Sequence, residues 1–190
     1  LPDKWGNRVF EHWAKMRGIK SSDITPVDKL SFIGSRGMGA LEFEPAMSVQ
    51  DDVQDIQIQD LYALAQRIFD ERAEVSVLPE ESITMQRLYA VGTSAGGQHP
   101  KAILAINSKT GEIRSGQLDW SQEYKYYILK FAESTTFPHT QVEMAYYQMA
   151  TNMGINMMPS QLKEIDGQYH FLTERYDRQN GERIHTQTLA

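Results

Sequence analysis

The sequence predicts an α+β fold in which an antiparallel sheet packs against one helix, with further helices ahead of it. Two observations lead to this fold class. Before Val91, apolar residues recur at the spacing of amphipathic helices. After Val91, short apolar runs separated by turn residues predominate, and Asp166-Gly167 stands between two of them, as in a tight β-hairpin.

Residues 1–47 form the first stretch, and it begins with an aromatic helix expected over 5–17. A glycine-punctuated segment, 34–39, then leads into a strand-like segment, 40–44. The helix prediction rests on four apolar residues at helical spacing: Trp5, Val9, Trp13 and Met16.

Residues 48–90 are predicted to form a helical connector. Its first part, 48–60, is polar and acidic, which is typical of a linker that runs into a helix. The helix that follows is expected to end near Val75, and its apolar face consists of Leu61, Leu64, Ile68 and Phe69. A second helix is expected over 80–90, because Pro79 suits the start of a helix.

Residues 91–190 begin with a glycine-rich loop and continue as strands with one helix. The expected strands are 102–107, 112–117, 124–131, 163–165 and 168–173. The helix is expected over 140–153, with Gly154 as its C-terminal stop. Methionine packs irregular gaps, so we expect core filling by Met149, Met153, Met157 and Met158.

The composition excludes several kinds of site. The absence of cysteine excludes disulfides, thiolate metal sites and thiolate nucleophiles. The net charge of −6 argues against DNA binding by this chain alone. No apolar run approaches the roughly 20 residues that span a bilayer. The five histidines are scattered without ligand spacing, so no protein-built metal site is expected.

The glycine-rich loop spans residues 92–101 and precedes a strand. Glycines let backbone N–H groups turn towards an anion, and Lys101 adds a positive charge. The loop lacks the spacing of a P-loop. A flexible turn between a helix and a strand remains the alternative.

Lys130 stands within an apolar strand-like run, where an unpaired lysine is unusual. A kinase needs such a lysine to hold nucleotide phosphates, and it needs a carboxylate to hold the lysine. Glu143, near the start of the next helix, is a candidate for that partner. The alternatives are a lysine that extends to solvent from a strand end and a solvated helix-terminal glutamate.

Taken in order, these elements resemble the HipA-type toxin serine/threonine kinases. The resemblance rests on Ser94-Ala-Gly-Gly97 with Pro100-Lys101, Ile128-Leu-Lys130, Glu143 with Tyr146-Tyr147, and Glu174-Arg-Tyr-Asp-Arg178. It implies a partial HipA N-terminal subdomain over 1–47, the connector over 48–90, and a protein-kinase-like N-lobe over 91–190, up to the hinge and the start of the C-lobe.

The resemblance also implies roles for individual residues. The implied ATP-binding residues are Ser94, Ala95, Gly96, Gly97, Gln98, Lys101, Lys130, Glu143, Glu174, Tyr176 and Asp177. Among them, Ser94 is the implied autophosphorylation site, with Thr93 as the alternative. The backbone of 96–98 covers the phosphates. Glu174 and Tyr176 flank the adenine at the hinge, and Asp177 contacts the ribose.

By the same resemblance, the catalytic loop and the ligands for Mg²⁺ lie in a C-lobe beyond Ala190. We therefore expect no catalytic residue and no metal ligand within the chain. The sequence begins at Leu1 with a helix already under way, which is typical of a fragment. Such a fragment is expected to bind ATP weakly and to phosphorylate nothing efficiently, since phosphoryl transfer depends on positioned Mg²⁺.

The implied whole protein is an ATP- and Mg²⁺-dependent kinase of the bacterial cytoplasm, with no membrane association. It is the toxin of a toxin–antitoxin pair and arrests growth by phosphorylating a translation component such as glutamyl-tRNA synthetase. Its partner is a HipB-like DNA-binding antitoxin, through which DNA is contacted indirectly. Two alternatives stay open: a non-catalytic interaction module and a small-molecule kinase on a similar scaffold.

Overall fold

Five α-helices and a five-stranded antiparallel sheet form the described part of the chain. The computed structural model describes residues 3–47, 56–70, 82–92, 96–133 and 137–187. The helices are α1 (Lys4–Met16), α2 (Pro26–Ile33), α3 (Ile58–Asp70), α4 (Ser82–Gly92) and α5 (His139–Asn152). The strands are β1 (Lys101–Asn107), β2 (Ile113–Ser115), β3 (Tyr124–Lys130), β4 (Ser160–Ile165) and β5 (Gln168–Glu174). The predicted α+β class is confirmed.

Local sequence signals account for the starts of the first two helices. Asp3 caps α1, and its Oδ1 accepts a hydrogen bond from the Lys4 N–H at 2.7 Å. Thr25 and Asp28 form a capping box at α2, with Pro26 at the first helical position. Two short 3₁₀ turns, η1 (Ser21–Asp23) and η2 (Gly34–Arg36), lie next to these helices in the sequence.

The sheet has the strand order β2-β1-β3-β5-β4, and every neighbouring pair is antiparallel. The β4–β5 hairpin turns at Asp166 and Gly167, whose φ angles of 50° and 74° are those of a type I′ turn. The hairpin prediction is therefore confirmed. A separate two-stranded ribbon, β6 (Arg178–Gln179) and β7 (Glu182–Arg183), follows β5.

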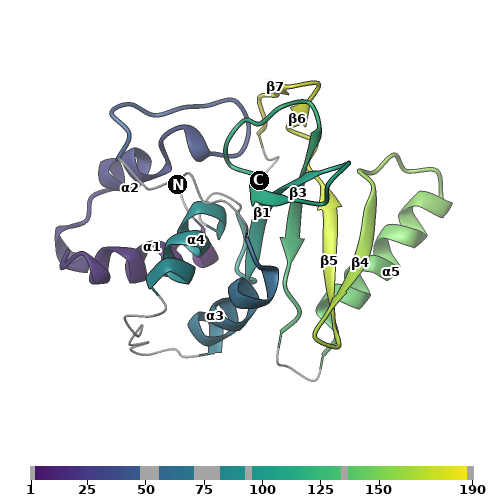
Figure 1. Cartoon of the computed structure of the whole chain (residues 1–190), viewed down its shortest axis with the longest axis horizontal. Helices are drawn as coiled ribbons and strands as arrows, with labels where there is room; N and C mark the ends of the chain where they lie inside the picture. The colour runs from purple at the N-terminus through teal and green to yellow at the C-terminus, as the bar shows by residue number, and fades with distance from the viewer. Residues whose placement is uncertain (1–2, 48–55, 71–81, 93–95, 134–136, 188–190) are drawn as a thin grey trace.

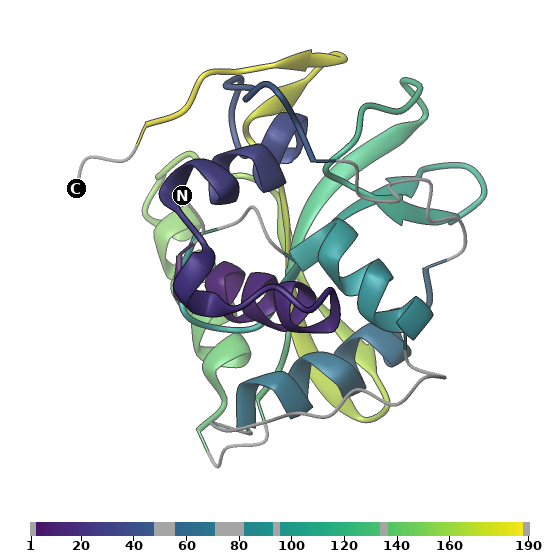
Figure 2. The ribbon, with the colours of Figure 1, turned by 90° about the vertical axis from the view of Figure 1, so that its left-hand side faces the viewer.

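The main core lies between one face of the sheet and the N-terminal helices. Figure 1 shows α1, α3 and α4 on this side and α5 on the other, and Figure 2 looks onto the helical side. Trp5 of α1, Leu61 of α3 and Leu88 of α4 are buried in one apolar cluster with Leu104 and Leu129 of the sheet. The first helix and the sheet therefore share a core, although they are distant in sequence.

Two expectations from the sequence are wrong. Residues 40–44 do not form a strand, because no neighbouring strand pairs with them; the Phe43 N–H donates instead to the Gly34 carbonyl at 3.2 Å. The methionines expected in the core are not buried, and Met149 and Met153 are 59% and 79% exposed. The reason is that α5 has a single buried residue, Thr140, so its outer face has no partner within the described residues.

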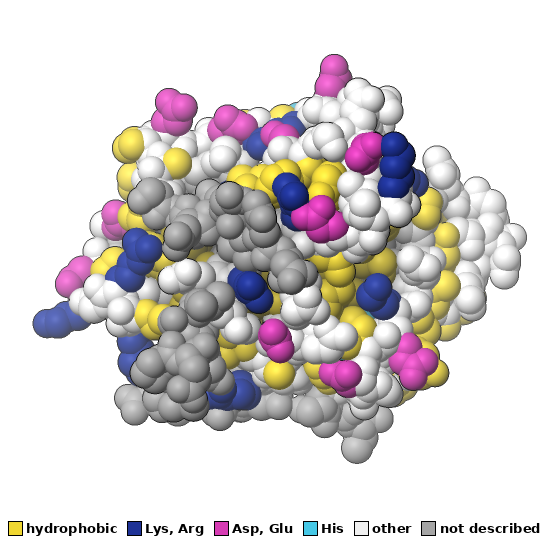
Figure 3. All heavy atoms as spheres, in the orientation of Figure 1, with side chains coloured by type: hydrophobic (Ala, Val, Ile, Leu, Met, Phe, Trp, Pro, Cys, Tyr) yellow, Lys and Arg dark blue, Asp and Glu magenta, His cyan; other side chains and the backbone are white. Residues whose placement is uncertain are grey.

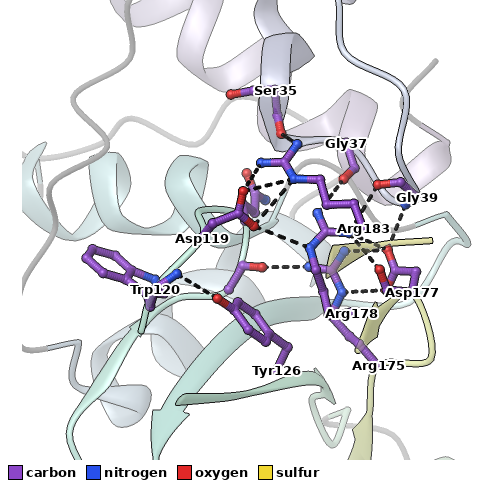
Figure 4. Close-up of polar contacts among 12 residues, drawn as sticks. Ser35, Gly37, Gly39, Asp119, Trp120, Tyr126, Arg175, Asp177, Arg178 and Arg183 are labelled. Atoms are coloured by element: carbon purple, nitrogen blue, oxygen red, sulfur yellow. Dashed lines mark hydrogen bonds and ion pairs between the residues drawn. The ribbon is translucent and has the colours of Figure 1, made fainter. Parts of the chain in front are cut away.

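A buried arginine–aspartate cluster, formed by Arg175, Asp177 and Arg178, joins the end of the sheet to the N-terminal part of the chain (Figure 4). Asp177 has no solvent exposure and accepts hydrogen bonds from Arg175 at 2.8 and 2.6 Å. It also accepts the Gly39 N–H at 2.7 Å, and Arg178 donates to the Gly39 carbonyl at 3.0 Å. The third guanidinium nitrogen of Arg175 donates to the Gly116 carbonyl at 2.6 Å.

Replacing Asp177 by asparagine should lower the free energy of unfolding by about 3 kcal/mol, because it leaves two guanidinium groups buried without their carboxylate. Burial, the largest single effect, would raise the pKa of Asp177, but the hydrogen bonds and charge of Arg175, the Gly39 N–H and the charge of Arg178 together lower it. The stabilisation is therefore present above the ordinary aspartate pKa and lost as pH falls through the lowered one. Urea unfolding measures the change. Asp119→Asn, at a half-exposed carboxylate, is the matched control and should cost less than about 1 kcal/mol.

His170 should make stability fall as the pH drops below about 6.5, the ordinary histidine pKa. Its ring is fully buried, and Nδ1 accepts the Ala132 N–H at 3.0 Å. Burial lowers the pKa of His170, so at acidic pH the unfolded chain binds a proton at this residue that the folded chain does not bind. His170→Asn keeps an acceptor near Nδ1 and should reduce the dependence of unfolding free energy on pH, by at most about 1.4 kcal/mol per pH unit. Equal slopes in the two proteins would contradict this assignment.

Candidate functional site

An ion pair between Lys130 and Glu143 lies on the α5 side of the sheet. Lys130 ends β3, and its side chain shares a face with Ile128 because side chains alternate along a strand. Glu143 lies in the first half of α5, which packs against β4 and β5. The structure thus brings together the two residues that the sequence analysis paired. Both side chains are about one-third exposed, so Lys130 remains accessible to a ligand.

A hollow of about 800 Å³ adjoins this ion pair and also borders Glu174 and Tyr176. Its walls are mainly apolar, with Ile128 and Phe171 from the sheet and Tyr147 from α5. The volume falls within the range of roughly 300–1,000 Å³ that small-molecule sites occupy. Four of the residues predicted to bind ATP therefore surround one cavity.

Lys101 and Lys130 place two positive charges beside each other at the end of β1 and β3. The two lysines are directly opposite in the strand register. Lys101 Nζ donates to the Gly96 carbonyl at 2.9 Å. Burial, with the charge of Lys130 second, lowers the pKa of Lys101 to about 8. A bound anion would relieve this repulsion, so the pair favours a negatively charged ligand.

The glycine-rich loop is described from Gly96 onward, and Thr93, Ser94 and Ala95 lie outside the described residues. Gly97 has a φ of 105°, which side chains rarely adopt, and a Cβ there would lie 2.9 Å from Lys101 Nζ. Glycine at this position therefore allows the loop backbone and the lysine to approach each other.

The start of α1 holds this loop through contacts that the sequence analysis did not find. Asp3 Oδ2 accepts the Gly97 N–H at 2.8 Å, and the Trp5 N–H donates to the Gly97 carbonyl at 3.1 Å. The buried Trp5 indole donates to the Lys101 carbonyl at 3.0 Å, and Lys4 reaches Gln98 at 3.4 Å. The hydrogen bond from Gly97 is the main cause of a lowered Asp3 pKa. Asp3 and Gly97 are 94 positions apart, so no local sequence pattern could link them.

The segment after β5 carries the remaining predicted residues. Tyr176 is half exposed at the hollow, whereas its neighbours Arg175 and Asp177 are buried in the arginine–aspartate cluster. Both oxygens of Asp177 are engaged by that cluster and by Gly39. The ribose contact implied for Asp177 stays a prediction, and the structure gives this carboxylate a set of protein partners.

A second polar cluster, formed by His99, Glu133 and His139, was also not predicted from the sequence. Both histidines contact the Glu133 carboxylate, His99 closely and His139 at 3.9 Å. These residues come from the glycine-rich loop, the segment after β3 and the start of α5. Their separation in the sequence, 34 positions between His99 and Glu133, gives no recognisable spacing.

Among the described residues, no group of three or more histidine, aspartate and glutamate side chains has an arrangement that could hold a metal ion. The described helices include none with the length and apolar character needed to cross a bilayer.

Comparison with known protein families identifies the family of this chain. The family model described as HipA-like C-terminal domain matches residues 93–190, more than half of the chain. The chain belongs to this HipA-like family. The matched range contains all the residues from Ser94 to Asp177 that the sequence analysis proposed for the site. Among curated proteins, none matches the chain.

Removing the charge of Lys130 should raise the pKa of Lys101 from its value of about 8, since Lys130 is the second cause of the lowering. The measurement is an NMR titration of the Lys101 Nζ in the wild type and in Lys130→Met. Burial still acts in the variant, so the pKa should stay below the ordinary lysine value of about 10.4. Lys109→Met, in an exposed turn, is the control. A Lys101 midpoint that Lys130→Met leaves unchanged would show that the two charges do not interact.

Proposed function

We propose that this chain supplies the ATP-binding part of a HipA-like serine/threonine protein kinase. The Lys130–Glu143 ion pair at the edge of the hollow is the observation that carries the proposal. In protein kinases, a strand lysine binds nucleotide phosphates and is held by a glutamate from the neighbouring helix. Membership of the HipA-like family supports the same function.

The hollow suits a nucleotide in size and in the distribution of its polar groups. Lys130 and Lys101 would donate to phosphate oxygens at one end, and Glu143 would keep the Lys130 ammonium in place. The backbone of Gly96 to Gln98 would cover the phosphates. At the other end, Glu174 and Tyr176 would flank the base. ATP would supply the phosphoryl group, and ligands for Mg²⁺ are proposed to come from a C-lobe beyond this chain.

The proposed acceptor of the first phosphoryl group is Ser94 in the glycine-rich loop, with Thr93 as the alternative. For the whole kinase we propose a role as the toxin of a toxin–antitoxin pair that modifies a translation component, such as glutamyl-tRNA synthetase. A HipB-like antitoxin would provide DNA contact. On the face shown in Figure 3, basic and acidic side chains are interspersed, which supports an indirect contact over direct DNA binding by this chain.

An interaction module without catalysis is the second candidate, and one observation favours it. Tyr146 and Met149 of α5 and the C-cap residue Met153 are each more than half accessible to solvent. Exposed apolar side chains that lie together on one surface are typical of docking sites. This candidate predicts a stable chain that has no affinity for nucleotides.

Lys130→Met should weaken ATP binding about tenfold or more, because a charge-assisted hydrogen bond to a phosphate contributes on the order of 1.5–3 kcal/mol. Glu143→Gln should weaken it less, since the lysine remains. Calorimetry with Mg-ATP measures both, and Lys109→Met, remote from the hollow, should bind as the wild type does. Absence of ATP binding by the wild-type chain and by the full-length protein would contradict the kinase proposal and favour the interaction module.

Phosphorylation is tested separately with the full-length protein. Intact mass and peptide mapping after incubation with Mg-ATP should find one phosphate on Ser94 or Thr93 in the wild type and none in Lys130→Met. Incorporation that survives in Lys130→Met would contradict the role given to this lysine.

A further inference from the structure

Glu133 is a nearly buried carboxylate at the meeting point of three elements of the site. Its side chain is 4% exposed, whereas those of its two partners, His99 and His139, are each 42% exposed. Burying an unpaired carboxylate is costly, so its partners matter for where the surrounding segments lie. These three residues lie outside the set proposed to bind the nucleotide.

The backbone on either side of Glu133 is anchored to the rest of the fold. The Phe131 N–H donates to the Pro100 carbonyl at 3.0 Å, and the Ala132 N–H donates to His170 Nδ1 at 3.0 Å. Gln66 of α3 donates to the Ala132 carbonyl. The carboxylate therefore projects from a segment that is tied to the glycine-rich loop, to β5 and to α3.

The two histidines belong to the segments that carry the nucleotide-binding candidates. His99 lies in the loop, two residues after Gly97 and two before Lys101. His139 is the first residue of α5 and stands one helical turn before Glu143. Residues four apart lie on the same face of a helix, so His139 and Glu143 share the face of α5 that contacts Glu133 and Lys130.

Apolar packing fixes α5 only weakly. Thr140 is its single buried residue, and its outer apolar side chains are exposed. A helix with few buried apolar contacts has low local stability. The position of α5 therefore depends on the polar contacts that its first two turns make: those of His139, Glu143 and the Thr140 hydroxyl, which donates to the Tyr169 carbonyl at 2.6 Å.

We infer that Glu133 is a positioning residue: through His99 and His139 it sets the glycine-rich loop and α5 relative to β3. It thereby places Lys101 beside Lys130, and Glu143 at the hollow. The consequence for ATP rests on the function proposed above. The placement of the two segments does not, because it concerns contacts within the chain alone.

The described groups that face the carboxylate are these two histidines; Phe69 of α3 and Phe137 contact the rings and carry no charge. The nearby Lys130 is paired with Glu143.

The test compares the ATP affinity of the wild type with that of Glu133→Gln. The variant should bind ATP about three- to tenfold more weakly, which is the effect of losing a charge-assisted hydrogen bond to half-exposed partners. Glu164→Gln, at an exposed glutamate on β4, is the matched control and should bind ATP as the wild type does.

A double variant, His99→Gln with His139→Gln, makes the test independent of how well Glu133→Gln folds. It should bind ATP more weakly than the wild type, and adding Glu133→Gln should have no further effect. Equal affinities of the wild type and Glu133→Gln, or fully additive effects in the combined variant, would overturn the inference.

A readout without nucleotide separates this inference from the proposed function. In amide NMR spectra of the free protein, Glu133→Gln should shift the resonances of both Gly97 and Glu143, which lie on different segments, whereas Glu164→Gln should shift neither. If the wild type binds no ATP, the proposed function fails and these resonances still decide the placement. Unshifted Gly97 and Glu143 resonances would overturn the inference whatever the ATP result.

Discussion

The buried arginine–aspartate cluster ties together segments that no sheet or helix connects. One carboxylate, Asp177, satisfies Arg175 and Arg178, and both arginines also donate to loop carbonyls near residues 39 and 116. Charges are tolerated in an interior only when geometry and hydrogen bonding are nearly complete, so the cluster permits one arrangement of these loops. The N-terminal segment, the loop after β2 and the end of β5 are consequently placed together. Tyr176, between two members of the cluster, is fixed at the edge of the hollow as a result.

Helices and strands with a strong hydrophobic periodicity could be predicted from the sequence. Which segments pair with or pack against one another could not. The helix at 4–16, the strands from Lys101 to Lys130 and the hairpin at Asp166 all follow from apolar spacing and turn residues. Residues 40–44 have the alternation of a strand but no neighbour to pair with, and a strand needs a neighbour. The apolar stripe of α5 likewise predicted burial, although nothing in the described structure covers it. The hydrophobic pattern of a segment shows which face it can bury. It does not show whether another part of the chain covers that face.

The residues of the candidate site likewise fall into those that the sequence could identify and those that it could not. Lys130 and Glu143 could be paired from the sequence because a lysine in an apolar strand needs a carboxylate, and the resemblance to HipA-type kinases indicated which one. Asp3, His99 and Glu133 could not be found, since each acts on a residue far along the chain and is ordinary in its local context. Such contacts arise only when the core brings α1, the loop and β3 side by side.

The site therefore combines rigid and responsive parts. β3 is held by seven residue pairs to β1, and Leu129 on its far face is fully buried, so the Lys130 backbone has little freedom. Glu143, by contrast, belongs to a helix held mainly by polar contacts: Glu143 to Lys130, His139 to Glu133, and the Thr140 hydroxyl to the Tyr169 carbonyl. A negative ligand near Lys130 competes with Glu143 for the same ammonium. When a ligand takes the place of Glu143 at Lys130, α5 would be free to move away from β3. The contact between His139, its first residue, and Glu133 prevents this movement. Charge at Glu133 and charge in the hollow therefore act on the same helix, so its placement depends on both.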